Sequence, residues 1–594
     1  MIRGGRRVPR RALLVSALVL SAGLLPPGYH PLASLPVALL ALLVAIDLFR
    51  APDRPVSASW TWLPVSVACG IAAASTCMAL QPLRSLRLIS LWLAAALACI
   101  AARSIPRGRG WAAVVASIVL VASIQSGIGI WQSTVSFPSA ARIPGGSSGE
   151  AEAAPGAARE DDVRRAAVAA RVRSGRAVGL LGLPALLASV EILALPVAAA
   201  AALTVRGPLR YLSGAAALLI AAGLAATRSL GGAASLALAA AACSTWWGGM
   251  AAAHRRAILG ALVLIAVAAG VPRLVSPGEQ SVGRALSLRA GNWASALGML
   301  ADHPAAGVGP GNYGTAYPAH RQAGSNESRH AHNSLLEILS DNGVAMVVPL
   351  VLLVIGFLGT IARSSVADDD PPWRWVRRAL AVGALAWGVQ NLVDFSAYAG
   401  GSVIPALALA GLLAARGRGA TPTGVAGAPP ALSWGSLAAG AVAVAAVAAA
   451  ALSLPDALSQ WNLERAADAA REGEKDGALR LARRAAAWNP WEAEARVAVA
   501  HALLDRLGSG LLSAEERAAA IEESLREAAG AVRLDPLTAN RRMTLVRART
   551  EAGDVAGAFA AASMAARLNS FRPDYAASRD ALEAALRGPG GAAP

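Results

Sequence analysis

Lysine is almost absent from this chain. Lys475 is the only lysine among 54 basic residues, so arginine carries the net charge of +17. These arginines cluster in short segments between apolar runs, which is the positive-inside pattern of a membrane protein and not the continuous basic patch of a nucleic-acid-binding protein. We therefore expect no nucleic acid among its partners.

Cysteine is scarce as well. The few cysteines lie inside apolar segments, without the paired spacing of a metal centre or a disulfide framework; they are Cys69, Cys77, Cys99 and Cys243. We interpret them as small core residues, and we expect neither a metal nor another cofactor.

Apolar sequence, by contrast, is abundant. Hydrophobic residues make up 55% of the chain and the mean hydropathy is +0.48, whereas soluble proteins average about 45–50% apolar residues. The long apolar runs end near residue 455, and the remainder is rich in Arg, Glu and Asp. We predict a transmembrane domain over residues 1–455 and a soluble domain over residues 456–590.

The apolar runs predict an all-α polytopic bundle of about 12–13 spans in a bacterial inner membrane. Several runs are shorter than the roughly 20 residues that an untilted helix needs. The first is interpreted as an uncleaved helix and not a signal peptide, because a second run follows almost at once. The predicted spans are residues 12–25, 32–49, 60–80, 86–103, 111–131, 179–203, 209–226, 233–249, 257–275, 343–363, 379–396, 402–415 and 432–454.

Arginine-rich connections follow the even-numbered spans, which places the N-terminus in the cytoplasm. The connection around Arg84 and Arg87 is basic although it falls on the outer side in this scheme, so the topology depends on a correct span count. Three segments are predicted on the periplasmic side: residues 132–178, the large loop 276–342 and the tail beyond residue 454.

Three similar turns recur in the alanine-rich tail, at Ala487–Pro490, Leu534–Pro536 and Leu568–Ser570. Asp535 and Asn569 are 34 residues apart (569 minus 535), which is the tetratricopeptide period. An insertion of about 12 residues near 508–518 explains the longer first interval. We predict tetratricopeptide-like helical repeats over residues 456–590; the alternative is a helical hairpin that only caps the membrane domain.

The large loop contains a glycine-rich segment. A short amphipathic helix is predicted over residues 291–303, ending at Pro304, and tightly turned backbone follows. There Gly309, Gly311 and Gly314 spell G-x-G-x-x-G. No predicted strand precedes this pattern and no acidic residue follows at the required distance, so we reject a dinucleotide site.

The loop closes with HAHNSLLEILSDNG over residues 330–343. Helical spacing places His332 above Leu336 and puts Asn333, Glu337 and Asp341 on a neighbouring stripe. A histidine at the start of a helix, beside carboxylates and amides, suits a general base, which must titrate near neutral pH.

These segments resemble the signature loop of the O-antigen ligase and O-antigen polymerase superfamily, which are membrane glycosyltransferases that use lipid-linked glycans. The resemblance rests on DHPAAGVGPGNY followed by HAHNSLLEILSDNGV, and it covers roughly residues 175–415. Thr227–Gly232 resembles the family's Ser-Arg-Gly turn, with Thr-Arg-Ser in its place, and Arg176–Pro196 resembles a family span. That span has an asparagine in the family where Ala185 stands here.

The resemblance implies a GT-C-like membrane bundle that moves a glycan from a polyprenyl diphosphate, such as undecaprenyl diphosphate, to lipid A core, a growing polysaccharide or a protein. Arginine binds a diphosphate bidentately and neutralises it as it leaves, so we expect metal-free, inverting transfer. The predicted catalytic residues are Arg228, Arg289 and His332. The predicted substrate-binding residues are Asp302, His303, Gly309, Gly311, Asn312, Tyr313, His330, Asn333, Glu337 and Asp394.

Simpler roles stay open for several of these residues. His330 and His332 could bind a metal, although no third ligand is evident, and Asn333 could cap a helix. Arg289 could anchor the loop to lipid phosphates, and Tyr313 could pack the loop.

Two other functions also stay open. A flippase for lipid-linked glycans needs many spans, but it would not need a folded outer loop with His332. A non-catalytic scaffold would recruit an envelope protein through its repeat tail, because such repeats bind peptides in their concave face.

Overall fold

The computed structural model describes residues 8–25, 34–50, 62–141, 169, 171–246, 282–322, 325–326, 328–363, 371–415, 454–508 and 512–587. These residues form helices joined by turns, with no strand among them. The predicted all-α class is confirmed. The predicted span over residues 257–275 lies outside the described residues, and so does the predicted span over residues 432–454 except for Leu454.

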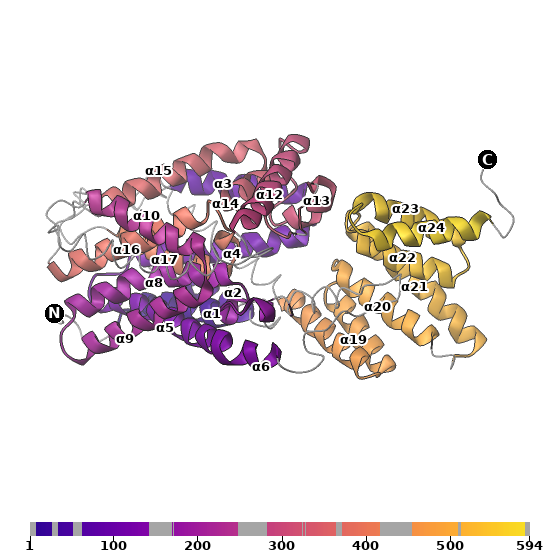
Figure 1. The fold of residues 1–594 in the computed structure, drawn as a ribbon, viewed down its shortest axis with the longest axis horizontal. Helices are drawn as coiled ribbons and strands as arrows, with labels where there is room; N and C mark the ends of the chain where they lie inside the picture. The colour runs from indigo at the N-terminus through magenta and orange to yellow at the C-terminus, as the bar shows by residue number, and fades with distance from the viewer. Residues whose placement is uncertain are drawn as a thin grey trace.

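Long apolar helices form the membrane part, and their axes run roughly side by side (Figure 1). The 11 predicted spans that fall on described residues each overlap one of them. The helices are α1 (Arg10–Leu24), α2 (Ser34–Arg50), α3 (Trp62–Cys77), α4 (Pro82–Arg103), α5 (Arg109–Trp131), α6 (Phe137–Ala141), α8 (Pro184–Thr204), α9 (Pro208–Thr227), α10 (Leu230–Trp246), α15 (Val347–Arg363), α16 (Pro371–Gln390) and α17 (Gly400–Ala414).

Length and composition make this a multi-pass membrane protein. Several further apolar helices of the bundle, such as Ser34–Leu48, are shorter than a full span. The total number of spans therefore stays a prediction. Five helices of the described chain are long and apolar enough to cross a bilayer: α4, Arg109–Ser139, α8, α9 and Val344–Ala362.

Small residues let these helices pack backbone to backbone, as is common where lipid surrounds a bundle. A Cβ atom at Gly411 of α17 would lie 2.2 Å from the carbonyl oxygen of Cys99 in α4. A Cβ atom at Gly383 of α16 would lie 2.6 Å from the carbonyl oxygen of Leu193 in α8. Larger side chains at either position would force the paired helices apart.

The large loop folds into three helices at one end of the bundle, close to α3 (Figure 1). They are α12 (Val282–Asp302), α13 (Tyr313–His320) and α14 (Ser334–Asn342). A 3-10 turn over Val344–Met346 then leads into α15. The helix α12 is longer than the predicted helix over residues 291–303 and ends one residue earlier.

The tail is a stack of helices in which each packs on the next (Figure 1). A first helix over residues 454–471 leads into it. Ser513 and Glu516 form a reciprocal capping box at the start of the longest helix. The helices that follow the first are α19 (Lys475–Trp488), α20 (Ala493–Leu507), α21 (Ala514–Leu534), α22 (Ala539–Glu551), α23 (Val555–Leu568) and α24 (Pro573–Arg587).

The three recurring turns of the tail have the same backbone conformation. Asn489, Asp535 and Asn569 end α19, α21 and α23 with φ of −136°, −141° and −141° and ψ of 88°, 79° and 78°. The helix α21 has 21 residues, whereas α19 and α23 have 14. The extra length of α21 therefore contains part of the predicted insertion. The three turns are thus similar in structure as well as in sequence, whereas the tetratricopeptide assignment stays a prediction.

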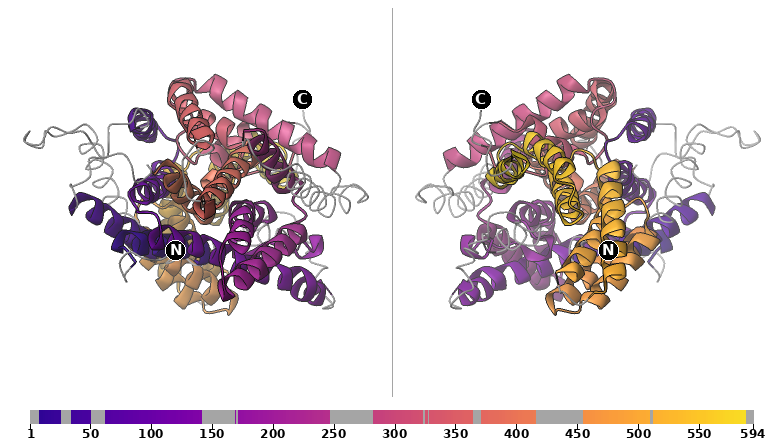
Figure 2. Two further views of the ribbon diagram at one scale, coloured as in Figure 1. Left: turned by 90° about the vertical axis from the view of Figure 1, so that its left-hand side faces the viewer. Right: turned by 90° about the vertical axis from the view of Figure 1, so that its right-hand side faces the viewer.

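The tail docks on the end of the bundle that carries the large loop (Figure 1), and it lies in front of the bundle in the right-hand view of Figure 2. Arg87 of α4 forms ion pairs with Asp456 and Glu492 of the tail. The guanidinium of Arg321, which follows α13, lies 4.5 Å from the ring centroid of Phe571. The basic connection at Arg87, which is the exception to the arginine pattern, therefore has acidic partners on its own side of the membrane.

Candidate active site

Gly309 and Gly311 shape the turn that fixes the large loop on the membrane bundle. Both have left-handed backbone, with φ of 95° and 75°, which glycine adopts without strain. A Cβ atom at Gly309 would lie 2.2 Å from the Cβ atom of Ala79, and the amide of Leu80 donates to the carbonyl of Val308 at 3.2 Å. The G-x-G-x-x-G pattern thus serves close packing: Gly309 on the connection between α3 and α4, Gly311 on α4, and Gly314 on Arg329.

Asn312 and Tyr313 hold the same turn from within. The side-chain amide of Asn312 donates to Ser85 Oγ near the start of α4 at 3.0 Å. The hydroxyl of Tyr313 donates to the backbone carbonyl of Asn292 at 2.9 Å. Burial raises the pKa of the Tyr313 hydroxyl well above its ordinary value. These two predicted substrate-binding residues therefore have packing partners inside the protein.

Asp302 and His303 lie at the exposed end of α12. The Oδ2 oxygen of Asp302 lies 2.9 Å from Nε2 of His320 in α13. This pair joins two helices of the loop, and it leads away from the segment that carries His332.

His332 lies before α14 and not within it. It has a left-handed backbone with φ of 54°, and the helix begins two residues later at Ser334. Asn333 is the N-cap: its side chain accepts hydrogen bonds from the amides of Leu335 and Leu336, both at 3.1 Å. The expectation that His332 stacks above Leu336 in the helix is therefore wrong. Helical geometry begins only after the Asn333 cap, so His332 lies outside the helix.

Ser334 joins the start of α14 to the turn that follows α16. Its amide donates to the carbonyl of Asn391 at 2.8 Å, and its hydroxyl donates to Oδ1 of Asn391 at 2.6 Å. The same turn brings Asp394 to His332, with 3.5 Å between Oδ1 and Nδ1. The Asp394 side chain is 3% exposed and the His332 side chain 31% exposed. A buried carboxylate thus stands behind a solvent-accessible imidazole.

A second histidine and carboxylate pair lies beside the first. Nδ1 of His330 lies 2.7 Å from Oε1 of Glu337, whose other oxygen accepts a hydrogen bond from the amide of Ala331 at 2.9 Å. The ring of His330 stacks on Phe395 with centroids 3.9 Å apart, and His332 meets the same ring edge-on at 5.1 Å. Two imidazoles therefore share one aromatic wall.

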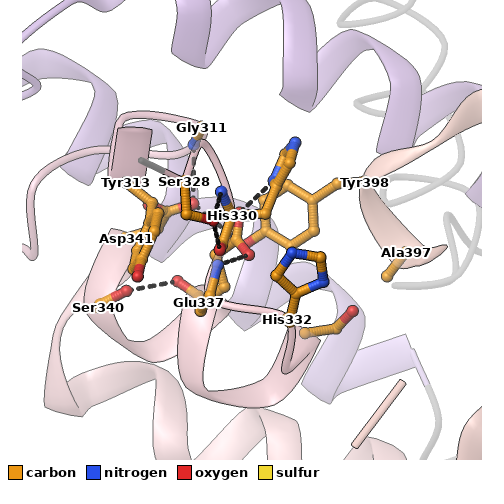
Figure 3. A network of polar contacts seen from close by, with 12 residues as sticks. Gly311, Tyr313, Ser328, His330, His332, Glu337, Ser340, Asp341, Ala397 and Tyr398 are labelled. Atoms are coloured by element: carbon orange, nitrogen blue, oxygen red, sulfur yellow. Dashed lines mark hydrogen bonds and ion pairs between the residues drawn. The ribbon is translucent and has the colours of Figure 1, made fainter. Parts of the chain in front are cut away.

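Asp341 ties the glycine turn to the segment between α16 and α17 (Figure 3). Its Oδ2 oxygen accepts hydrogen bonds from the amide of Gly311 at 2.8 Å and from the hydroxyl of Tyr398 at 3.0 Å. Complete burial, with the nearby charge of Glu337, raises the pKa of the Asp341 carboxyl well above its ordinary value. Burial and the charge of Asp341 raise the pKa of the Tyr398 hydroxyl as well.

Arg289 contacts the turn that carries Asp394, and Arg228 lies three residues before a glycine that packs near that turn. Nε of Arg289 in α12 donates to the carbonyl of Val393 at 3.1 Å. Arg228 ends α9 in the left-handed conformation, with φ of 49°. Gly231 follows it, and a Cβ atom there would lie 3.5 Å from Cγ2 of Val393. Arg289 of α12 thus bonds the Val393 backbone, one residue from Asp394, and the first turn of α10 packs near the Val393 side chain.

Four residues that shape this site had no predicted role. They are Asn391, Phe395 and Tyr398 in the turn after α16, and Arg176, which donates from Nε to the carbonyl of Thr227 at 2.8 Å. The available signal was the interruption of an apolar run by asparagine and aspartate, which indicated a polar turn but not its partners.

Within the described part of the chain, no three His, Cys, Asp or Glu side chains are grouped so that they could hold a metal ion. There His330 and His332 turn their Nδ1 atoms towards different carboxylates, on Glu337 and Asp394. The arrangement suits proton transfer by one imidazole and charge neutralisation by Arg289.

The family model described as O-antigen ligase matches residues 215–351. The matched segment begins within α9 and ends within α15, so it contains Arg228, Arg289 and His332 but neither Asp394 nor the tail. A comparison with curated proteins found no match.

Proposed function

Because residues 215–351 make this chain a member of the O-antigen ligase and polymerase superfamily, we propose that it is a membrane glycosyltransferase that moves a glycan from a polyprenyl diphosphate carrier to an acceptor. The acceptor classes are lipid A core, a growing polysaccharide and a protein. The matched segment supports the ligase or polymerase type of reaction in general. The donor, the stereochemistry and the residue roles are our own proposal.

One observation carries the proposal. The solvent-accessible imidazole of His332 faces the buried carboxylate of Asp394 at 3.5 Å. The turn that bears Asp394 accepts a hydrogen bond from Arg289, and α10, which begins two residues after Arg228, packs near it. A base with an orienting carboxylate, and cations that can neutralise the leaving group, are what transfer from a diphosphate requires.

The proposed reaction is a single displacement. With Nδ1 of His332 towards Asp394, Nε2 accepts the proton of the acceptor hydroxyl. The hydroxyl oxygen attacks the anomeric carbon from the face opposite the diphosphate, so the new bond has inverted configuration. The bond between that carbon and the diphosphate oxygen breaks, and its electron pair leaves with the diphosphate.

Arg228 and Arg289 would stabilise the departing diphosphate. A guanidinium stays charged throughout and binds two phosphate oxygens with parallel N–H donors. The carbonyl of Val393 holds Nε of Arg289, which leaves the outer edge of that guanidinium for a ligand. These two cations supply the charge neutralisation on which the proposed metal-free transfer depends.

We place the site on the periplasmic side of the inner membrane. The arginine-rich connections support this orientation through the positive-inside rule, and the basic exception at Arg87 has acidic partners in the tail. A reporter enzyme fused after residue 594 is expected to be active only outside the cytoplasm. Activity in the cytoplasm would overturn the orientation.

Transfer assays in isolated membranes test the catalytic assignment. We expect Arg289→Ala and His332→Ala each to lower transfer at least about 100-fold, with unchanged amounts of protein in the membrane. His320→Ala is the matched control, because His320 belongs to the same loop but bonds Asp302. Wild-type rates in the first two variants would exclude the proposed roles.

The surface glycans of a deletion strain distinguish the acceptor classes. Loss of long chains with short ones retained would identify a polymerase. A complete chain left on its lipid carrier would identify a ligase, and loss of glycan from proteins alone would identify a protein glycosyltransferase.

A further inference from the structure

The helix α19 carries an exposed stripe of two arginines and two tryptophans. Arg480, Arg484 and Trp488 follow each other at intervals of four residues, so they lie on one face of the helix. Trp491 continues the stripe just past the helix end. The two indoles are 48% and 65% exposed, and both arginines are exposed.

This stripe is not used in the packing of the tail. The buried residues of α19, such as Ala482 and Ala485, lie on another face, against α20. Arg483 points to a third direction, where it pairs with Glu523 of α21 at 2.5 Å. Large aromatic side chains left in solvent on a folded helix mark a surface that meets another phase or molecule.

The position of the stripe indicates which surface it contacts. Glu492, the residue after Trp491, forms an ion pair with Arg87, which lies in the second turn of the candidate membrane span Pro82–Arg103. The stripe therefore ends beside the N-terminal part of a candidate membrane span.

Tryptophan usage in the tail points the same way. The tail has only three tryptophans, Trp461, Trp488 and Trp491, and all precede residue 492. The hundred or so residues beyond have none. Tryptophan concentrates where one edge of the ring meets hydrocarbon and the other meets water, which is the membrane interface.

We propose that the stripe formed by Arg480, Arg484, Trp488 and Trp491 binds the headgroup region of the bilayer beside the bundle. The two indoles lie at the boundary between headgroups and acyl chains, and the two guanidinium groups bind lipid phosphates. The tail is then held by lipid as well as by its contacts with Arg87 and Arg321. This inference does not depend on the proposed glycosyltransferase reaction.

A spin label on the stripe tests this in the full-length chain. In a background without the native cysteines, Ala487→Cys labels an exposed position beside Trp488, and Ala518→Cys labels an exposed position on α21 as the matched control. In nanodiscs with about one-third anionic lipid, we compare the collision rate of the spin label with oxygen, which dissolves in lipid, and its collision rate with a water-soluble nickel chelate. We expect the oxygen-to-nickel ratio at residue 487 to exceed that at residue 518 at least about threefold.

Two further measurements separate the alternatives. Trp488→Ala together with Trp491→Ala is expected to lower the ratio at residue 487 to that at residue 518, and lipid without negative charge is expected to lower it in part. Equal ratios at both positions in the unaltered stripe would overturn the proposal. Protection of residue 487 that appears only after soluble O-polysaccharide is added would also overturn it, in favour of a glycan-binding surface.

Discussion

Nδ1 of His332 lies 3.5 Å from Oδ1 of Asp394, and neither atom has a hydrogen-bond partner among the described residues. A hydrogen bond needs a separation shorter by about half an ångström. Catalytic contacts of this kind are often long without substrate and tighten when the complex forms. The two side chains come from different segments, one before α14 and one after α16, so a small shift of either segment closes the gap.

Asp394→Asn tests whether this contact matters. The amide occupies the same volume but cannot hold the Nδ1 proton in the required tautomer, so we expect glycan transfer to fall about 100-fold with the fold unchanged. Transfer is measured in membranes that contain equal amounts of each variant. A rate within twofold of wild type would mean that Asp394 only shapes the turn.

Substitutions of Arg228 can distinguish its effect on folding stability from its effect on glycan transfer. Its left-handed backbone costs a residue with a side chain roughly 1–3 kcal/mol, and glycine avoids that cost. We therefore expect Arg228→Gly to unfold at the same temperature as wild type or a higher one, yet to lose transfer. Arg228→Ala is the matched control, because it loses the guanidinium but keeps the backbone strain. An active Arg228→Gly variant would remove Arg228 from the mechanism.

Asp341→Asn is expected to change the dependence of stability on pH. The folded state raises the pKa of this carboxyl above its ordinary value of 3.8, so its contribution to stability is complete below that value and is lost as pH rises through the folded pKa. Asparagine can still accept from Gly311 and Tyr398 but does not ionise. Thermal unfolding in detergent between about pH 5 and about pH 8 should therefore show a smaller loss of stability in the variant. Parallel curves would contradict this.

Arg87→Glu is expected to release the tail from the bundle. Two attractive contacts, with Asp456 and Glu492, become repulsive. Spin labels on Cys77 and on Ala518→Cys, with the other cysteines removed, report the separation of the two parts. We expect a broad distance distribution in Arg87→Glu and a narrow one in the unaltered protein.

Charge reversal on the tail provides the control for that measurement. Asp456→Arg with Glu492→Arg should narrow the distribution again when it is combined with Arg87→Glu, because opposite charges then face each other. A narrow distribution in Arg87→Glu alone would mean that other contacts, such as Arg321 with Phe571, suffice to hold the tail.

Local sequence pattern was sufficient for the helical architecture. Apolar runs located the helices because burial in lipid requires continuous apolar sequence, and the interval between Asp535 and Asn569 located turns that share one conformation. Helix ends were less predictable. The predicted span 379–396 ends at Gln390 in the structure, because the next residues bond to Ser334.

The sequence predicted which residues belong to the candidate site but not which contacts they make. Spacing grouped His332 with the helix that follows, but the Asn333 side chain takes the first amides of that helix, so His332 turns away. The partners of the two histidines in the turn after α16, Phe395 and Asp394, are distant in sequence. No periodicity within one segment indicates such partners.

Repeat proteins ordinarily lengthen or shorten by whole units over evolution. Here the turn at Asn489 leads into Glu492 beside Arg87, and the turn at Asn569 leads into Phe571 beside Arg321. Both turns thus rest on fixed positions of the membrane part, and the distance between those positions sets how many units fit between them. Deleting or duplicating one unit would leave one of the two arginines without its partner, so these two contacts tie the length of the tail to the membrane part.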